Sequence, residues 1–236
     1  MFRKKTVLIT GANRGIGYEA AKELAESGHR VILTARNEEK GLKAKDSIKG
    51  DVIFYLLDVT QSESIKHLAK FIEKDVGTID VLINNAGSLF DPKRFEVNPD
   101  NPLDTSVEVL NQTLQLNLVG AYNVTKHVLP FMNKTKRADI INVSSGMGAL
   151  REMGGGTPAY RISKTALNAL TKILTAEFKK TNLHVNSICP GWVRTDLGGP
   201  EAIRSVEEGV VGILWIINDE PEVRGQFIRD KEFLEF

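Results

Sequence analysis

The sequence predicts an α/β fold, a doubly wound and mostly parallel sheet of about seven strands with helices on both faces. Short runs of β-branched and aliphatic residues recur along the chain and are almost wholly apolar, which is typical of strands covered on both faces. Longer segments with helical periodicity separate these runs. Such alternation with short connections favours right-handed crossovers within one sheet. Because no linker rich in proline or serine divides the chain, residues 1–236 are expected to form a single domain.

The apolar runs define the expected strands and the periodic segments define the expected helices. The strands are expected at residues 6–10, 31–34, 53–57, 81–84, 140–144, 184–189 and, as a short final one, around 226–228. The helices are expected at residues 16–27, 38–48, 62–76, 104–132, 158–180 and 205–217. A polar loop with several prolines and aspartates is expected at residues 88–101.

Composition and charge exclude several classes of function. The 31 Lys and Arg residues against 30 Asp and Glu residues give a net charge of +1, so no overall field attracts nucleic acid or an anionic membrane. No apolar run is long enough to cross a bilayer, and residues 6–10 are too short for a signal-peptide core. The single cysteine, Cys189, fits a reducing compartment, and the four histidines lack a metal-binding spacing. We expect a cytoplasmic protein without a metal.

A glycine-rich turn follows the first expected strand and leads into a helix. It reads Thr10-Gly11-Ala12-Asn13-Arg14-Gly15-Ile16-Gly17. Gly11 permits a tight turn, Gly15 lets the backbone approach a phosphate, and Gly17 allows close packing of helix on strand. The free N–H groups and the positive end of the helix dipole favour an anion. A purely structural joint is the alternative, but the position between first strand and first helix favours a dinucleotide pyrophosphate.

The end of the second expected strand indicates which dinucleotide. Proteins of this fold that bind NAD carry an acidic residue there, about 20 positions beyond the glycine motif, to bind the ribose 2′-hydroxyl. This chain has Ala35 followed by Arg36, and Arg14 can reach the same ribose. Two guanidinium groups suit a 2′-phosphate, although both could be solvated surface arginines. We therefore expect NADPH as the cofactor.

In the order of its motifs, the chain resembles the short-chain dehydrogenase/reductase family, which has a Rossmann-type fold. The resemblance covers nearly the whole chain, and the ordered set is far more specific than any one motif. The matching positions are the glycine turn, Asp58-Val59, Asn84-Asn85-Ala86-Gly87, Asn117, Ser144-Ser145, Tyr160 with Lys164, and Pro190-Gly191.

Within this family the chain is most similar to the carbonyl reductases. The similar stretches are residues 13–17, 34–36, 189–196 and 225–228. Monomeric animal carbonyl reductases carry a long insertion between the catalytic Ser and Tyr, whereas only fourteen residues, 146–159, separate Ser145 from Tyr160 here. Their substrate range and oligomeric state therefore do not transfer to this chain.

The resemblance implies a catalytic set of Ser145, Tyr160, Lys164 and Asn117. Tyr160 would donate a proton to the carbonyl oxygen, and Ser145 would hydrogen-bond the same oxygen. Tyr160 and Lys164 are four residues apart and share a helix face, so we expect the ammonium of Lys164 to lower the pKa of Tyr160. Lys164 would also hold the nicotinamide ribose, and Asn117 would hold a water linking Lys164 to solvent, unless its amide only stabilises the helix.

Two neighbours of these residues are expected to have no catalytic role. Ser144 is the less suitable serine, because adjacent strand residues face opposite sides. Cys189 is expected to be a buried, inert thiol. The cofactor-binding residues that the resemblance implies are Gly11, Asn13, Arg14, Gly15, Ile16, Gly17, Arg36, Asp58, Val59, Asn85, Ala86, Gly87, Tyr160, Lys164, Pro190, Gly191, Val193 and Thr195.

The expected function is NADPH-dependent reduction of the carbonyl of small aldehydes, ketones or quinones. One alternative is a reductase of β-ketoacyl or steroid-type substrates. Another is a non-catalytic NADP sensor, but such proteins typically lose the Tyr or the Lys that this chain keeps. The helices at 104–132 and 158–180 carry more apolar residues than one core-facing stripe needs, so we expect a homodimer or homotetramer built on them.

Overall fold

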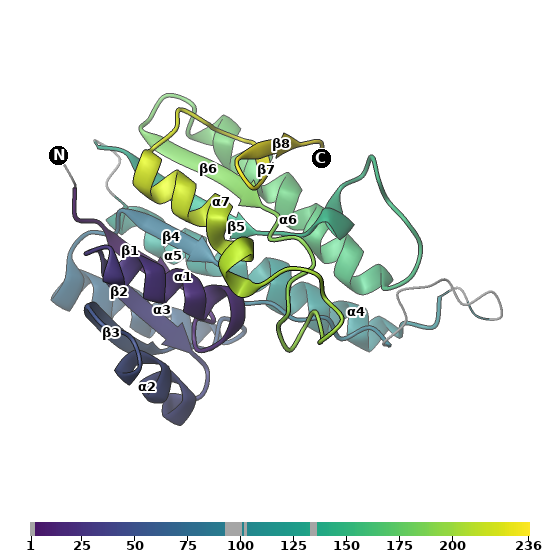
Figure 1. Ribbon diagram of the computed structural model, residues 1–236, viewed down its shortest axis with the longest axis horizontal. Coiled ribbons are helices and arrows are strands. Elements are labelled where there is room, and N and C mark those ends of the chain that lie inside the picture. Colours follow the sequence, from purple (N-terminus) through teal and green to yellow (C-terminus); the bar gives the residue numbers. More distant parts are fainter. Residues whose placement is uncertain (1–2, 93–100, 102, 133–135) are drawn as a thin grey trace.

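The computed structural model describes residues 3–92, 101, 103–132 and 136–236 of the chain (Figure 1). Within these residues it contains one eight-stranded sheet in the order β3-β2-β1-β4-β5-β6-β7-β8. Every neighbouring pair is parallel except β7 with β8. The doubly wound, mostly parallel sheet is thus confirmed. The chain order reverses between β1 and β4, and open α/β sheets bind ligands at such a switch point.

The strands begin and end close to the expected positions. Their bounds are β1 (Thr6–Ile9), β2 (Arg30–Ala35), β3 (Asp51–Leu56), β4 (Val81–Asn84), β5 (Ala138–Val143), β6 (Leu183–Ile188), β7 (Phe227–Arg229) and β8 (Glu232–Leu234).

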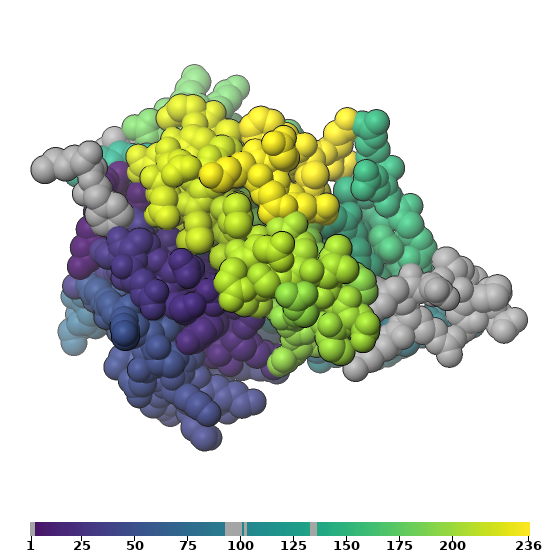
Figure 2. All heavy atoms as spheres, in the orientation of Figure 1, coloured from purple at the N-terminus to yellow at the C-terminus, as the bar shows by residue number. Residues whose placement is uncertain are grey.

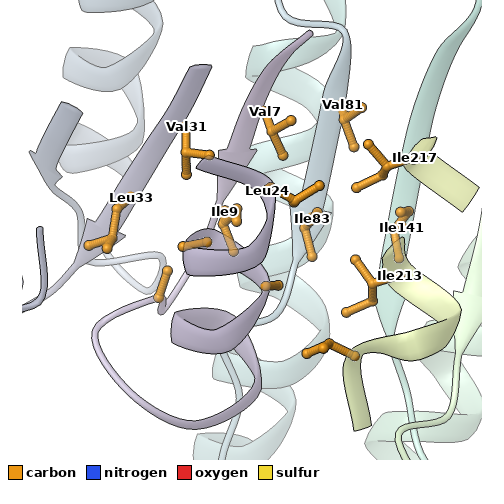
Figure 3. Close-up of a cluster of buried hydrophobic side chains, with 14 of the residues drawn as sticks. Val7, Ile9, Leu24, Val31, Leu33, Val81, Ile83, Ile141, Ile213 and Ile217 are labelled. Carbon is orange, nitrogen blue, oxygen red and sulfur yellow. The ribbon is translucent and has the colours of Figure 1, made fainter. Parts of the chain in front are cut away.

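Successive strand side chains enter two different apolar cores, one on each face of the sheet. In β1, Val7 and Ile9 pack into one core and Leu8 into the other, and all three are fully buried. Figure 3 shows the first of these cores, in which Leu24 and Ile213 lie over the strand side chains. Burial on both faces explains why the strands read as continuous apolar runs.

The helices cover the two faces in two groups (Figure 1). Their bounds are α1 (Gly15–Glu26), α2 (Glu38–Asp46), α3 (Ser62–Phe71), α4 (Val107–Leu114), α5 (Ala121–Val128), α6 (Pro158–Glu177) and α7 (Val206–Asp219). Helices α1, α2 and α7 supply the core of one face, and α3, α5 and the end of α6 pack on the other. None of the helices in the described part of the chain is long and apolar enough to cross a membrane.

The expected helix at 104–132 is a composite of four pieces. It begins at Val107, because the Ser106 side chain caps it by accepting from the Val109 N–H over 3.3 Å. Helix α4 then passes into a π-helical stretch (Gln115–Gly120), α5 and a 3₁₀ turn (Leu129–Phe131). The π-helical stretch widens the turn that carries the candidate residue 117, and such turns often occur at functional sites.

Strand β8 is absent from the sequence-based prediction. It pairs antiparallel with β7 across a turn in which Asp230 and Lys231 take positive φ values of 50° and 72°. Turns with positive φ values usually contain glycine or asparagine, which are recognisable in a sequence. This turn contains neither residue, so no local pattern indicates a hairpin. Residues 93–100 of the expected polar loop lie outside the described residues.

Candidate active site

The glycine turn after β1 is held by the asparagine motif after β4. Gly11 has a φ of +65°, and a Cβ atom there would lie 2.9 Å from the Cα atom of Ala86. The Asn85 side chain donates to the carbonyl oxygens of Thr10 and Gly11, each over 2.9 Å. The Thr10 hydroxyl accepts from the N–H groups of Asn85 and Ala86, each over 3.0 Å. The two motifs therefore form one unit at the switch point, and the amide of Asn85 is committed to shaping the turn.

The N-terminus of α1 offers hydrogen-bond donors to an anion. Its N-cap residue, Arg14, makes no side-chain capping bond, and the first turn contains no acidic residue. Gly15, with a φ of +58°, lies under Thr195, whose Cγ2 atom is 3.2 Å from the place of a Cβ on that glycine. A larger residue would therefore be strained and crowded. Uncapped N–H groups beside bare backbone fit the pyrophosphate of a dinucleotide.

The two arginines of the proposed 2′-phosphate site differ in their contacts. Arg36 is exposed and directly follows Ala35, the buried last residue of β2. Arg14 forms an ion pair with Asp196, and both side chains are largely exposed. In Figure 2 the yellow-green atoms of the segment before α7, which contains Asp196, lie against the purple atoms after β1. Asp196 was not expected at this site, since no local pattern links it to Arg14.

The structure brings Ser145, Tyr160 and Lys164 together at the carboxyl end of β5. Tyr160 and Lys164 are buried on the same face of α6, with the Lys164 Nζ atom 5.6 Å from the tyrosine ring centroid. Ser145 lies beside the Tyr160 side chain, where it lowers the pKa of the phenol, and it accepts from the Met147 N–H over 3.2 Å. Ser144 faces elsewhere, because its hydroxyl donates to the Lys164 carbonyl oxygen over 3.3 Å.

Burial governs the ionisation of both titratable groups in this cluster. Burial raises the pKa of Tyr160 to about 12, although the neighbouring Ser145 side chain opposes this rise. Burial also lowers the pKa of Lys164 to about 8. The net shift of the Tyr160 pKa is therefore upward, and the lowering effect expected of Lys164 stays a prediction. The Lys164 Nζ atom donates to the Val143 carbonyl oxygen over 2.8 Å and lies 5.6 Å from the tyrosine ring centroid.

Asn117 lies in the π-helical stretch and is 1% exposed. Its side-chain Oδ1 accepts from the Ser88 N–H over 2.9 Å, and its Nδ2 donates to the Ser88 carbonyl oxygen over 2.9 Å and to the Ser163 hydroxyl over 3.0 Å. Both amide hydrogens are thus used, and Oδ1 keeps one lone pair. The side chain fixes the segment after Gly87, and its role in holding a water stays a prediction.

The remaining expected residues follow the carboxyl ends of β3 and β6. Asp58 accepts from the Thr60 N–H over 2.9 Å and from its hydroxyl over 2.7 Å, which forms a tight turn. Gly191, after Pro190, has a φ of +83°, and its Cβ position would lie 2.4 Å from the Cδ atom of Arg204. Val59 packs against Gly120, and Val193 forms an isolated β-bridge with Arg204. Cys189 is buried as expected.

One buried carboxylate beside the cluster was missed. Asp91, in the segment after β4, is 4% exposed and accepts from the main-chain N–H groups of Ala159 and Tyr160, each over 2.9 Å. It therefore contacts the backbone of the candidate acid. The sequence around Asp91 does not indicate this contact, because Ala159 and Tyr160 lie 68 and 69 residues further along the chain.

Comparison with known proteins gives matches along almost the whole chain. The family model described as short chain dehydrogenase matches residues 5–203. Carbonyl reductase [NADPH] 1 of Mus musculus is 30% identical, over 97% of each chain.

Solved structures give the same result. The carbonyl reductase Sniffer of D. melanogaster has a TM-score of 0.87 and 30% identity, covering 99% of this chain and 100% of that one. The NADPH-bound carbonyl reductase from chicken fatty liver has a TM-score of 0.84 and 27% identity, covering 100% of both chains.

Proposed function

Because the chain belongs to the short-chain dehydrogenase/reductase family, we propose that it reduces the carbonyl group of small aldehydes, ketones or quinones with NADPH. The observation that carries the proposal is the convergence of Ser145, Tyr160 and Lys164 at the end of β5. This cluster and the glycine turn both lie at the carboxyl edge of the sheet, on strands joined through β4. The carbonyl reductases among its relatives are matched over nearly their whole chains and support the substrate class.

The residues present fit NADPH. The uncapped N–H groups of α1 would hold the pyrophosphate, and Lys164 would hold the nicotinamide ribose. Arg36, with Arg14, would bind the 2′-phosphate, since no carboxylate ends β2. When bound, NADPH supplies the hydride. The chicken fatty liver carbonyl reductase, which covers this chain throughout, was solved with NADPH bound.

The protonation states of the cluster suit carbonyl reduction. With a pKa of about 12, Tyr160 keeps its phenolic proton at neutral pH and can donate it to the carbonyl oxygen. Ser145 would donate a hydrogen bond to the same oxygen as negative charge develops there. With a pKa of about 8, Lys164 is mostly protonated at pH 7. Its positive charge would then stabilise the phenolate that Tyr160 leaves behind.

The test is NADPH oxidation, followed by absorbance, across a panel of aldehydes, ketones, quinones, steroid ketones and β-ketoacyl thioesters. We expect turnover with at least one small carbonyl compound, and loss of that turnover in Tyr160→Phe. Turnover confined to acyl thioesters or steroids would move the substrate class to those compounds. NADPH binding without turnover of any carbonyl compound would contradict the proposed activity and favour a sensor.

We also propose that the protein is a homodimer or homotetramer. Several apolar side chains on the α4–α5 composite and on α6 are at least two-fifths exposed, namely Val107, Val119, Tyr122, Ile162 and Ile173. A groove of about 630 Å³ runs along α6, lined by Ile162, Ala166 and Ala169 together with the loop that precedes the helix. Apolar surface of this kind is what a symmetric interface buries.

A further inference from the structure

Helix α6 begins with an unusual cap. A threonine N-cap followed by a proline in the first turn is a conventional helix start, and Thr157-Pro158 occupy those two positions. Thr157 instead takes a left-handed conformation, with φ 46° and ψ 54°, and its side chain makes no capping bond. Its Oγ1 atom is buried without a hydrogen-bond partner among the described residues. A β-branched residue is rarely found in this conformation, so the start of α6 is strained.

Asp91 supplies the cap that Thr157 does not. Its Oδ1 accepts from the Ala159 N–H and its Oδ2 from the Tyr160 N–H, each over 2.9 Å. The Thr105 hydroxyl donates to Oδ1 over 2.8 Å. The Asp91 side chain thus accepts three hydrogen bonds at the positive end of a 20-residue helix, as a helix cap does.

We propose that Asp91 is the positioning residue for Tyr160, an inference that rests on the proposed role of Tyr160 as the proton donor. The Asp91 carboxylate bonds directly to the main chain of Tyr160 and holds the first turn of α6 against the strain at Thr157. The segment that carries Asp91 is itself anchored, since Asn117 bonds both backbone groups of Ser88. The phenol is thereby placed relative to the carboxyl edge of β4 and β5.

Lys164 does not depend on this cap. It lies one turn further along α6, and its Nζ atom is held by the Val143 carbonyl oxygen. Loss of the Asp91 carboxylate should therefore displace Tyr160 and leave the nucleotide-binding end of the site in place. Loss of a positioning residue should lower kcat and leave the Kd for NADPH unchanged, whereas loss of a general structural residue should impair both.

The first arm of the test measures kinetics. In Asp91→Asn, which keeps the shape but turns an amide NH₂ toward one of the two N–H donors, we expect kcat to fall about tenfold or more while the Kd for NADPH changes less than about twofold. The matched control, Thr105→Val, removes the third donor and keeps both capping bonds, so its kcat should stay within about twofold. Adding Thr157→Gly to Asp91→Asn relieves the strain and should restore at least part of kcat. The proposal would be overturned if kcat were unchanged in Asp91→Asn, or if kcat and NADPH affinity fell equally. It would also be overturned if Thr157→Gly restored none of the lost kcat.

The second arm needs no turnover. Amide hydrogen exchange at Ala159 and Tyr160 should accelerate at least tenfold in Asp91→Asn and stay near the wild-type rate in Thr105→Val. Equal protection of these amides in both variants would show that Asp91 does not hold the turn. If Asp91→Asn does not fold, amide exchange at Ala159 and Tyr160 is measured in Asp91→Asn/Thr157→Gly instead. Exchange at the wild-type rate there would likewise show that Asp91 does not hold the turn. A wild-type protein that reduces no carbonyl compound would defeat the proposed function, while the exchange arm would still decide whether Asp91 holds the turn.

Discussion

The ammonium nitrogen of Lys164 donates a hydrogen bond to the main-chain carbonyl oxygen of Val143, the last residue of β5, over 2.8 Å. This bond fixes a buried cation at the edge of the sheet where Ser145 follows. Burial lowers the pKa of Lys164 from 10.5 to about 8, so the position of the ammonium has a consequence for stability as well as for chemistry.

The stability of the protein should depend on Lys164 in alkaline solution. The folded chain loses the Lys164 proton near pH 8, whereas the unfolded chain keeps it to about pH 10.5. Between these values the unfolded state binds more protons, so this group makes the free energy of unfolding rise with pH, by at most about 1.4 kcal/mol per pH unit. The rise should be absent in Lys164→Met. Urea denaturation of both proteins at pH 7, 8, 9 and 10 measures it.

Other groups titrate equally in wild type and Lys164→Met, so their contribution cancels in the difference between the two unfolding free energies. The difference in unfolding free energy, wild type minus Lys164→Met, should increase by roughly 2 kcal/mol from pH 8 to pH 10. Lys179→Met, at an exposed position after α6, is the matched control and should track the wild type. Parallel pH curves for wild type and Lys164→Met would mean that Lys164 is not the buried cation described here.

Tyr160→Phe and Lys164→Ala should separate proton donation from nucleotide binding. Tyr160→Phe removes only the hydroxyl, so we expect kcat to fall about 100-fold or more with NADPH affinity kept within about threefold. Lys164→Ala should weaken both, because one ammonium would serve the phenolate and the ribose. Stopped-flow reduction and titration calorimetry with NADPH give the two quantities. A Tyr160→Phe variant that keeps more than a few per cent of kcat would require another proton donor.

The nucleotide preference should depend on Arg36 and be limited by Asp196. We expect NADPH to bind at least about tenfold tighter than NADH, since a charged 2′-phosphate would meet two guanidinium groups. Arg36→Asp should narrow or reverse this preference. Asp196→Asn should strengthen NADPH binding up to about fivefold without changing NADH binding, because an exposed ion pair is worth about 1 kcal/mol at most and its loss frees Arg14.

Titration calorimetry with both nucleotides decides between these outcomes. Equal affinity of the wild type for NADPH and NADH would refute the 2′-phosphate site. An Asp196→Asn variant that gains equally for both nucleotides would show that Asp196 acts on the turn and not on the phosphate.

The oligomeric state should depend on the exposed face of α6. Light scattering after size exclusion at micromolar concentration should give a multiple of 26.1 kDa for the wild type. Ala169→Arg places a long charged side chain in the groove along α6 and should shift the mass toward the single chain. Leu42→Arg on α2, at another exposed apolar position, should leave the mass unchanged. A wild-type mass near 26.1 kDa would refute the oligomer.

Much of the fold could be predicted from the sequence, because its signals are local. Strands buried on both faces leave continuous apolar runs, and the two-residue alternation of Val7, Leu8 and Ile9 between cores needs no further information. The alternation of strands and helices with short connections predicted the doubly wound, mostly parallel sheet. The failures were local as well: β8 is three residues long and turns at Asp230 and Lys231 without glycine.

For the candidate site, the positions of the motifs could be predicted from the sequence, but the ionisation of their side chains could not. The motifs around Gly15, Asn85, Ser145 and Tyr160 each carry their spacing within a few residues, so their placement at the carboxyl ends of the strands could be predicted. The roles assigned to these residues stay predictions. The ionisation of Tyr160 could not be predicted, because burial within the folded chain raises its pKa, and no local pattern shows how deeply that side chain is buried.

By itself, then, the sequence determined the class of the fold, the approximate positions of its strands along the chain and the edge of the sheet where the motifs gather, because each depends on patterns only a few residues long. Tertiary structure alone decided which groups hold those motifs. Asp91 caps a helix 68 residues further on, and Arg14 pairs with Asp196 across 182 residues. A hydrogen bond or ion pair between such distant residues is specified by the packing of the whole chain, because neither partner carries a local signal of the other.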